Sequence, residues 1–349
     1  MRVVGIDPGT YSFDLFGMES NKMENKMESE IKNKMENRME NKTIVDESIR
    51  SEKIFKDPGI LIKKIKELMP LDIVIGPSGY GIPLKSIKNL SEEDIGRMIP
   101  LDTNVPVNEG IKNVLLKMKD MQMPVYFTPG VIDLKTVPAY RKWNRFDMGT
   151  ADKVCCVALG IKDQSERLKI PFNKTSFVYV EVGYGFTAVL GVENGKIVDG
   201  IGGTNGSPGF LACGGMDAEV AIRLKLPLTQ DLIFKGGLKD FVGEDIEPRD
   251  LAEFKEAMLL LGESIERDVA SMLVSVRNPK EILLSGRLMT YDPIKNEITH
   301  RLNKYAKVVQ VNRLSKIAKE AACGAYVIGE GLLGGKYHKL VENLEIVES

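Results

Sequence analysis

The first ten residues place a carboxylate where it can do chemistry. In the stretch GIDPGT an apolar run ends at Asp7, and Gly9 and Thr10 follow in a tight turn. Backbone N–H groups in such a turn can hold phosphate oxygens, and the aspartate can orient a Mg²⁺ ion directly or through water. The same carboxylate can also hold a metal that cuts nucleic acid, or simply cap a hairpin. The stretch by itself leaves these three interpretations open.

A second turn of the same design lies about one domain later. In FVYVEVGYGFTAVL, Glu181 ends an apolar strand, and Gly183 and Gly185 flank Tyr184. Glycines spaced by one residue let the backbone come close to a phosphate group. One such pair is a weak signal, but two matching hairpins can face each other across a cleft. The pair therefore favours a nucleotide site over a nuclease.

Two further stretches offer contacts to a nucleotide or to a second substrate. The apolar strand EILLSG ends at Gly286 before a helix, which suits backbone contact with adenosine, and Arg287 can stack on a base. The glycine-rich loop GPSGYG follows the strand LDIVI, and its Ser78 and Tyr80 offer hydroxyl groups to an acceptor. Each stretch also fits a purely structural turn.

Carboxylates and basic residues gather in PAYRKWNRFDMGTAD. Asp147 and Asp152 fit a general base toward a hydroxyl acceptor or a metal ligand, and Asp147 or Thr150 also fits a helix N-cap. Arg141, Lys142 and Arg145 are the local positive groups that could line a phosphoryl-transfer path, although a solvated basic loop has the same pattern. With only 2 histidines in the chain, acid–base work is expected from carboxylates, lysines or a metal-bound water.

The elements that must position these residues alternate between strands and helices. Apolar periodicity predicts strands at 1–7, 12–18, 43–49, 72–76 and 123–128, with helices near 58–68, 108–121 and 149–161. The polar stretch 162–174 is expected to connect two halves. The second half continues with a hairpin, a helix at 250–276, the strand EILLSG, and helices at 291–304 and 315–333.

Each half opens on a glycine-punctuated hairpin, which predicts two similar α/β domains at 1–174 and 175–349. The terminal helix is expected to pack back across the hinge between them. A tetrapeptide repeat, NKME, fills 21–42, and its methionine stripe winds around a helix instead of facing one core. We expect this segment to be an exposed insertion in a hairpin turn.

Composition narrows the class of protein. The 349 residues are 43% hydrophobic, and 48 basic and 49 acidic residues give a net charge of −1, which offers no general reason to expect nucleic acid or a membrane as a partner. The 4 cysteines lack a CxxC pair and are expected to be reduced, packed thiols. Because the chain opens on a strand and has no apolar run near 20 residues, neither a signal peptide nor a membrane span is expected, and the expected location is the cytoplasm.

Taken in order, the two hairpins, EILLSG and the helix AACGAYVIG resemble the superfamily of acetate and sugar kinases, Hsp70 and actin. More narrowly, the chain resembles the archaeal family of predicted butyrate kinases, a domain of unknown function allied to acetate and butyrate kinases. The stretch EVGYGFTAVLGVENGKIVDGIGGTNGSPG carries this likeness, including a loop with Gly202, Gly203 and Thr204. NRFDMGTADKV resembles the acetate kinase segment F-H-G-T-S-H-K, so Gly149, Thr150 and Lys153 align with it.

The resemblance implies two duplicated RNase H-like domains of the actin-like ATPase type, with ATP and Mg²⁺ in the cleft between them. It implies transfer of phosphate to a small acceptor, with a short-chain carboxylate suggested by the family name and a homodimer suggested by relatives. In this scheme Asp7 positions Mg²⁺, the two turns hold phosphates, Gly286 lies under adenosine and Asp147 is nearest the acceptor.

The sequence departs from the acetate kinase pattern at charged positions. Asp152 and Glu181 stand where that pattern has histidines, and its arginines are missing from LACGGMDAE and IGPSGYGIPL. Fewer positive groups are therefore available to the two anions of acyl phosphate transfer. These losses leave a rival open, an ATP-hydrolysing switch that acts on a protein partner. A nuclease is the third interpretation, and the charge balance argues against it.

Overall fold

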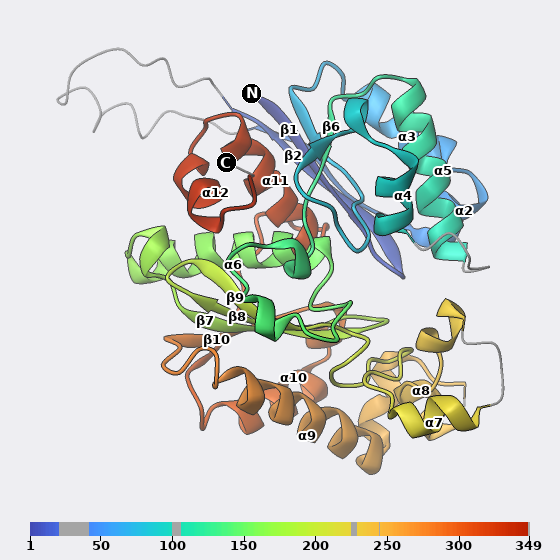
Figure 1. Cartoon of the computed structure of the whole chain (residues 1–349), viewed down its shortest axis with the longest axis vertical. Coiled ribbons are helices and arrows are strands. Elements are labelled where there is room, and N and C mark those ends of the chain that lie inside the picture. Colours follow the sequence, from blue (N-terminus) through green and yellow to red (C-terminus); the bar gives the residue numbers. More distant parts are fainter. Residues whose placement is uncertain (21–41, 100–105, 225–228, 244, 348–349) are drawn as a thin grey trace.

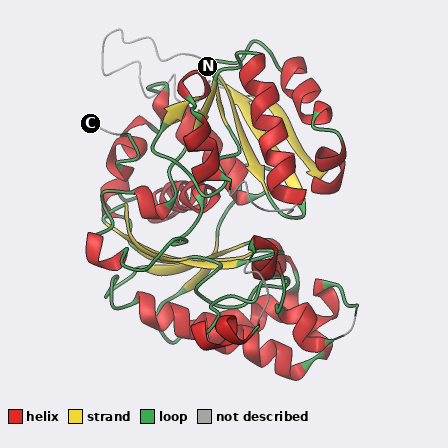
Figure 2. Ribbon diagram, turned by 45° about the vertical axis from the view of Figure 1, so that its right-hand side comes forward, coloured by secondary structure: helices red, strands yellow, loops and turns green. Residues whose placement is uncertain are grey.

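The computed structural model describes residues 1–20, 42–99, 106–224, 229–243 and 245–347. Two β-sheets lie one above the other, with helices between them and on their outer faces (Figures 1 and 2). The α/β class expected from the alternating pattern is confirmed.

The first sheet has the strand order β3-β2-β1-β4-β6-β5. Its strands are β1 (Arg2–Pro8), β2 (Ser12–Glu19), β3 (Lys42–Arg50), β4 (Ile73–Ile75), β5 (Lys85–Ser86) and β6 (Val125–Phe127). β1, β2 and β3 form an antiparallel meander, whereas β4 runs parallel to β1 and β6 parallel to β4. The helices of its outer side are α2 (Ser51–Lys56), α3 (Gly59–Glu67), α4 (Glu92–Met98) and α5 (Pro106–Asp120).

The second sheet repeats the arrangement in the order β11-β10-β7-β8-β9. Its strands are β7 (Phe177–Val182), β8 (Thr187–Glu193), β9 (Lys196–Ile201), β10 (Glu281–Ser285) and β11 (Val308–Gln310). An antiparallel meander again continues into parallel strands. The helices α9 (Lys255–Met272) and α10 (Asp292–Leu302) cover its outer face, and α7 (Ala218–Arg223) and α8 (Leu238–Val242) belong to the long excursion before α9. The repeated order supports a duplicated domain.

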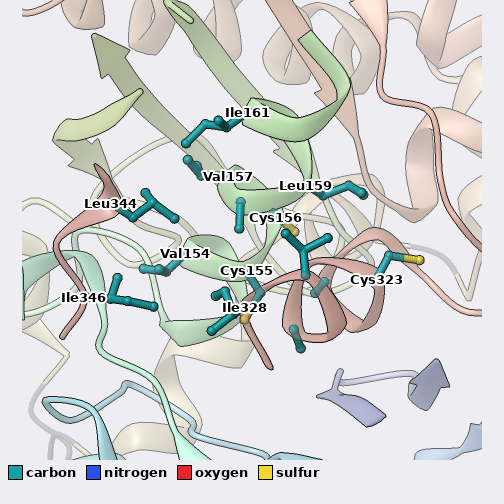
Figure 3. Close-up of a cluster of buried hydrophobic side chains, with 14 of the residues drawn as sticks. Val154, Cys155, Cys156, Val157, Leu159, Ile161, Cys323, Ile328, Leu344 and Ile346 are labelled. Atoms are coloured by element: carbon teal, nitrogen blue, oxygen red, sulfur yellow. The ribbon is translucent and has the colours of Figure 1, made fainter. Parts of the chain in front are cut away.

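A layer of helices joins the two sheets (Figure 1). It contains α6 (Ala151–Leu168), α11 (Glu320–Leu332) and α12 (His338–Leu344). α11 packs on β1, β2 and β4 of the first sheet, while α6 from the first half packs on β7 and β8 of the second. Figure 3 shows side chains of α6 and α11 gathered in the shared core. Each of these two helices packs on the sheet formed by the other half of the chain, so one hydrophobic core extends from the first sheet to the second.

Three sequence-based element boundaries were wrong. The stretch 162–174 is not a plain connection, because α6 continues to Leu168 and a short 3-10 turn follows. The helix expected at 250–276 is a 3-10 turn, Pro248–Glu253, followed by α9, and the helix expected at 315–333 begins only at Glu320. The sequence patterns did not predict several short elements, including α4, α7, α8, α12 and β11.

Other expectations concern the surface and the thiols. The repeat at 21–42 lies outside the described residues apart from Lys42, which begins β3. All 4 cysteines are free thiols, and Cys155, Cys156 and Cys323 are buried. Within the described ranges, none of the helices has the length and apolar character that crossing a bilayer requires.

Candidate functional site

Both glycine hairpin turns open into one cavity of about 190 Å³ between the two sheets. The turn from β1 to β2 contributes Asp7–Tyr11, and the turn from β7 to β8 contributes Gly183–Phe186. They meet closely, since a Cβ atom on Gly185 would lie 3.0 Å from Oγ1 of Thr10. The duplication therefore brings two equivalent turns, far apart in sequence, to the same place.

The hairpin of the first sheet sets two carboxylates side by side. In the β1–β2 register Asp7 lies directly opposite Asp14, and both side chains are buried. Lys319, the residue before α11, places its Nζ 3.2 Å from Oδ2 of Asp14 and 3.7 Å from Oδ2 of Asp7. Ser12 donates to the same Asp14 oxygen at 2.7 Å, whereas Oδ1 of Asp14 is buried and has no hydrogen-bond partner among the described residues. Lys319 thus forms ion pairs with both carboxylates.

A second lysine lies at the start of α6. Nζ of Lys153 is 2.6 Å from Oδ2 of Asp152 and 3.0 Å from Oε2 of Glu181, the residue that precedes the second glycine turn by two positions. The Thr150 hydroxyl donates to the other oxygen of Asp152. Burial opposes the charge on Asp152, but Lys153 and Thr150 outweigh it and lower the pKa of that carboxyl. Asp152 and Lys153 therefore stay charged inside the cavity.

At Asp7, unlike Asp152, burial outweighs the attraction of the nearby lysine. Burial raises the pKa of its carboxyl from 3.8 to about 7, and the charges of Asp152 and Asp14 add to that rise against the attraction of Lys319. Desolvation disfavours the anion, and like charges nearby disfavour it further. The site is therefore short of positive charge at the end of β1.

The donor set fits a divalent cation carried in with phosphates. The four carboxylates Asp7, Asp14, Asp152 and Glu181 against Lys153 and Lys319 leave a formal charge of −2 when all are ionised. Nowhere in the described ranges do three or more His, Cys, Asp or Glu side chains gather in a way that could hold a metal by themselves. Mg²⁺ commonly takes one or two carboxylates and completes its shell with phosphate and water, which suits this arrangement.

Asp147 lies in the cavity wall and links two loops. Its Oδ1 accepts from the Gly149 N–H at 2.9 Å, and its Oδ2 accepts from the N–H and hydroxyl of Thr204 at 3.2 and 3.3 Å. Asn205 donates to its backbone carbonyl. Burial raises the pKa of Asp147 although these N–H donors oppose the rise. The side chain does not cap α6, whose N-cap is Thr150.

The hydroxyl groups of the loop after β4 have different surroundings. Ser78 donates to the Gly76 carbonyl at 3.1 Å and accepts from the Thr128 N–H at 3.0 Å, so its hydroxyl holds the loop. Tyr80 reaches across the cavity, where its hydroxyl accepts from Nε2 of Gln230 at 3.2 Å. Burial and the nearby Asp147 raise the pKa of Tyr80 to about 12, so it is neutral.

Arg287 lines the cavity, but its guanidinium is already in contact with protein groups and is not free to stack on an adenine ring. Its guanidinium stacks on the Tyr11 ring at 3.9 Å from the centroid and donates to Oγ of Ser12 at 3.1 Å. Arg50 stacks on the same ring at 3.7 Å, and Tyr184 packs against it edge-on. These contacts tie the two hairpins together.

The expected basic loop is not part of the cavity. Arg141 donates to the Val198 carbonyl at 2.7 Å and lies 3.7 Å from Asp199, and Arg145 is exposed. The prediction that these arginines line the transfer path was wrong, because the loop faces β9 and solvent. Gly203 and Thr204 line the cavity, whereas Gly202 packs against Asp147 behind it and Gly286 packs against Val182.

Comparison with protein families identifies the chain. The family described as "Protein of unknown function (DUF1464)" matches residues 5–349. The chain belongs to this family. Comparison with curated protein sequences finds no match.

Solved structures similar to this DUF1464 protein include a propionate kinase from Francisella tularensis subsp. tularensis SCHU S4, with a TM-score of 0.62, 12% identity, and coverage of 93% of this chain and 98% of that one. An acetate kinase from Entamoeba histolytica follows with a TM-score of 0.59 and 13% identity, covering 87% of each chain. The Porphyromonas gingivalis acetate kinase gives 0.56 and 15%, covering 93% and 98%. At such identities the likeness establishes the fold alone, which is the two-domain fold of these kinases.

Sequence reasoning did not identify two charged residues of the DUF1464 site, Lys319 and Asp14. Lys319 received no prediction, and Asp14 was counted only as part of a strand. The hairpin register offered a signal for Asp14, because a short turn after Pro8 sets Asp7 opposite it. Nothing local marks Lys319, which is brought in by the packing of α11.

Proposed function

We propose that this DUF1464 protein transfers the γ-phosphoryl group of ATP to a small acceptor. The observation that supports the proposal best is the meeting of the two glycine turns, one from each sheet, at a cavity that also holds Asp7, Lys153 and Lys319. Glycine turns that let phosphates come close, together with lysines, suit a transferring phosphoryl group, because its catalysis is mostly positioning and charge stabilisation.

The phosphates of ATP would lie at the two turns, against Gly9 and Thr10 on one side and Gly183 and Gly185 on the other. A second hollow of about 370 Å³ adjoins the cavity through Tyr11 and Tyr184, and its lining also includes Arg50, Glu247, Arg249 and Tyr291. We place the adenosine there, because Tyr291 ends the short segment that Gly286 begins. In this placement Tyr184 and Arg249 offer stacking surfaces to the base.

Asp7 is the residue that we propose for Mg²⁺, and Lys153 for the γ-phosphate. The metal would supply the positive charge that the carboxylates lack and would orient the phosphates. Lys319 keeps Asp7 and Asp14 from repelling each other, so the turn holds its shape. Asp147 is proposed as the acceptor of the proton that a hydroxyl substrate loses; a carboxylate acceptor has no proton to give up. The names of the similar structures suggest short-chain carboxylates as the first acceptors to test, and a homodimer stays a prediction.

A labelled-phosphate experiment tests the proposal. ATP carrying a label on its γ-phosphate is incubated with Mg²⁺, the protein and candidate acceptors, and the label is followed into organic and inorganic products. We expect label in an organic phosphate, and we expect Asp147→Asn to lower its formation by about 100-fold or more while nucleotide binding persists. Asp199→Asn is the control, since Asp199 contacts Arg141 and Ser275 outside the cavity.

The opposite result would point to the ATP-hydrolysing switch. If the label appeared only in inorganic phosphate, at a rate that no acceptor changes, phosphotransfer would be wrong. Full organic phosphate formation by Asp147→Asn would leave transfer intact and remove the role proposed for Asp147.

A further inference from the structure

One part of the cavity lining is apolar and aromatic. It consists of Tyr80, Met98, Ile99, Phe186, Ile233 and Phe234, which we call the acceptor wall. The Tyr80 N–H donates to the Met98 carbonyl at 3.0 Å, and the rings of Phe186 and Phe234 pack edge-to-face at 5.0 Å. The Gln230–Tyr80 hydrogen bond joins the part of this wall from the first half of the chain to the part from the second. A small molecule at this wall would be largely removed from water.

No positive group serves the acceptor wall within the described residues. The cationic side chains among the described residues of the cavity lining are Lys153, Lys319 and Arg287. Lys153 is proposed to hold the γ-phosphate, Lys319 is paired with Asp7 and Asp14, and Arg287 is stacked on Tyr11. Each of the three also lies beside the hairpin turns, where the phosphates are proposed to bind.

The acidic group in this region is Asp147, which lines the cavity together with Tyr80. Burial raises the pKa of its carboxyl, whereas the N–H donors of Gly149 and Thr204 and the charge of Lys153 favour its ionised form. A carboxylate substrate placed here would lose its hydration without a cation of its own, because Lys153, whose charge acts on Asp147, is proposed to hold the γ-phosphate. It would also be repelled by the ionised form of Asp147. Burying an unpaired charge beside a like charge is strongly unfavourable. An acetate-like acceptor therefore does not match the wall.

We infer that the acceptor is an uncharged, mainly apolar alcohol whose hydroxyl meets Asp147 and Tyr80 and whose hydrocarbon part lies on the acceptor wall. The inference rests on the proposed phosphotransferase function and names its substrate class. An alcohol can donate to Asp147 and accept from Tyr80, so neither polar group is left without a partner. Its hydrocarbon part gains from burial against Met98, Ile99 and Phe234.

The reaction balances without any further reactant. The hydroxyl oxygen forms a bond to the γ-phosphorus, and the bond from that phosphorus to the β–γ bridging oxygen breaks. ADP leaves with the bonding electron pair, and the hydroxyl proton passes to Asp147 and then to solvent. The products are an alkyl phosphate, ADP and one proton, with no change of oxidation state.

Matched pairs of alcohols and carboxylates test the inference. In the presence of Mg²⁺ and a non-hydrolysable ATP analogue, 1-butanol and 1-hexanol are titrated calorimetrically beside butyrate and hexanoate. We expect each alcohol to bind more tightly than its carboxylate, by a factor on the order of 100 or more. With ATP, we expect alkyl phosphate and no acyl phosphate, which hydroxylamine would trap as a hydroxamate. Equal or tighter binding of a carboxylate, hydroxamate formation, or failure of both alcohols to bind would overturn the inference.

A charge-introducing variant gives a second test. Ile233→Lys adds a cation to the acceptor wall and is expected to reverse the preference toward butyrate. Ile222→Lys is the control, because Ile222 is 71% exposed on α7 and does not line the cavity. An unchanged preference in Ile233→Lys would contradict the assignment of this wall. The two proposals fail separately, since loss of nucleotide binding in these titrations defeats phosphotransfer, whereas nucleotide binding with a carboxylate preference defeats only the alcohol.

Discussion

At the scale of single residues, the two buried aspartates of the first hairpin define the site. Strand pairing forces Asp7 and Asp14 against each other, and like charges directly opposite destabilise a sheet. Lys319 reaches both, which converts a repulsive pair into a three-membered ionic cluster. The apo protein therefore depends on a lysine from the last quarter of the chain to hold the phosphate turn.

Removing that lysine is expected to destabilise the protein. Lys319→Met would leave two buried carboxylates without their cation, and breaking a buried pair in this way costs about 3–5 kcal/mol. Urea unfolding at neutral pH measures the change. Lys316→Met is the control, since Lys316 is exposed and should shift the free energy of unfolding by less than about 0.5 kcal/mol. Equal effects of the two substitutions would contradict the cluster.

The raised pKa of Asp7 predicts a pH dependence. Between the ordinary value of 3.8 and about 7 the folded state holds a proton that the unfolded chain has released, so this group makes stability fall as pH rises through that window. Asp7→Asn lacks the effect. Without nucleotide, the variant should gain stability over wild type between about pH 4 and about pH 8, by up to about 4 kcal/mol. If urea unfolding gave the same difference in free energy of unfolding between Asp7→Asn and wild type at both pH values, the Asp7 pKa would not be raised.

At the scale of elements, the contact between α6 and α11 positions both lysines. Lys153 lies in the first turn of α6 and Lys319 just before α11. The helices approach closely at Gly324, where a Cβ atom would overlap the Cys155 carbonyl oxygen. The small residues of AACGAYVIG thus allow the two helices to approach closely.

Widening this contact is expected to disturb stability and site together. Gly324→Ala forces the helices apart at a backbone atom, so we expect a loss of about 2 kcal/mol or more in place of the usual gain from alanine in a helix. Gly262→Ala in α9 is the matched control, because a Cβ atom there meets only the movable Arg301 side chain. Thermal unfolding of the two variants measures the difference, and a Gly324→Ala protein as stable as wild type would contradict the close packing.

The elements that the sequence predicted are those with a local signal. Both hairpins and the strand at 281–285 combine apolar runs with glycine turns, which need no knowledge of the rest of the chain. The end of α6 was missed because its polar residues were taken as exposed. Gln164 is buried and donates to Glu281 at 2.9 Å, and Arg167 contacts the same carboxylate at 2.8 Å. Polarity predicts exposure only where no partner from a distant strand is available.

The candidate site residues also divide into those with a local sequence signal and those placed only by tertiary packing. Turn residues such as Gly9 and Gly185 were found from their own neighbourhood and lie in the cavity. Arg141 and Arg145 were chosen for charge and nearness in sequence, and the fold turns them away. Lys319 replaces them as a cation of the site, 312 positions after Asp7 in the chain numbering. Such a pairing depends on tertiary packing that no local pattern reveals.

At the scale of the whole molecule, the shared helix layer predicts cooperative behaviour. One buried cluster contains Val3 of the first sheet, Tyr179 of the second and the residues of α6 and α11 between them. Domains joined in this way should unfold together, although two-domain proteins often do not. We expect one calorimetric unfolding transition. We expect Mg²⁺·ATP to shift the whole transition to higher temperature, with a gain of about 2.7 kcal/mol in the free energy of unfolding when the ligand is at a hundred times its dissociation constant. Two separate transitions, of which only one responds, would contradict the shared core.

The most direct test of a nucleotide clamp closed by a divalent cation is a calorimetric titration of the protein with ATP, with and without Mg²⁺. Carboxylates outnumber lysines at the turns, so binding should require the metal, and Gly185→Val, which crowds Thr10, should weaken it by at least about tenfold. Val274→Ala, which changes an exposed residue, should bind like wild type. Saturable binding only with Mg²⁺ would support the account, whereas no binding by the wild-type protein with Mg²⁺ present would contradict it.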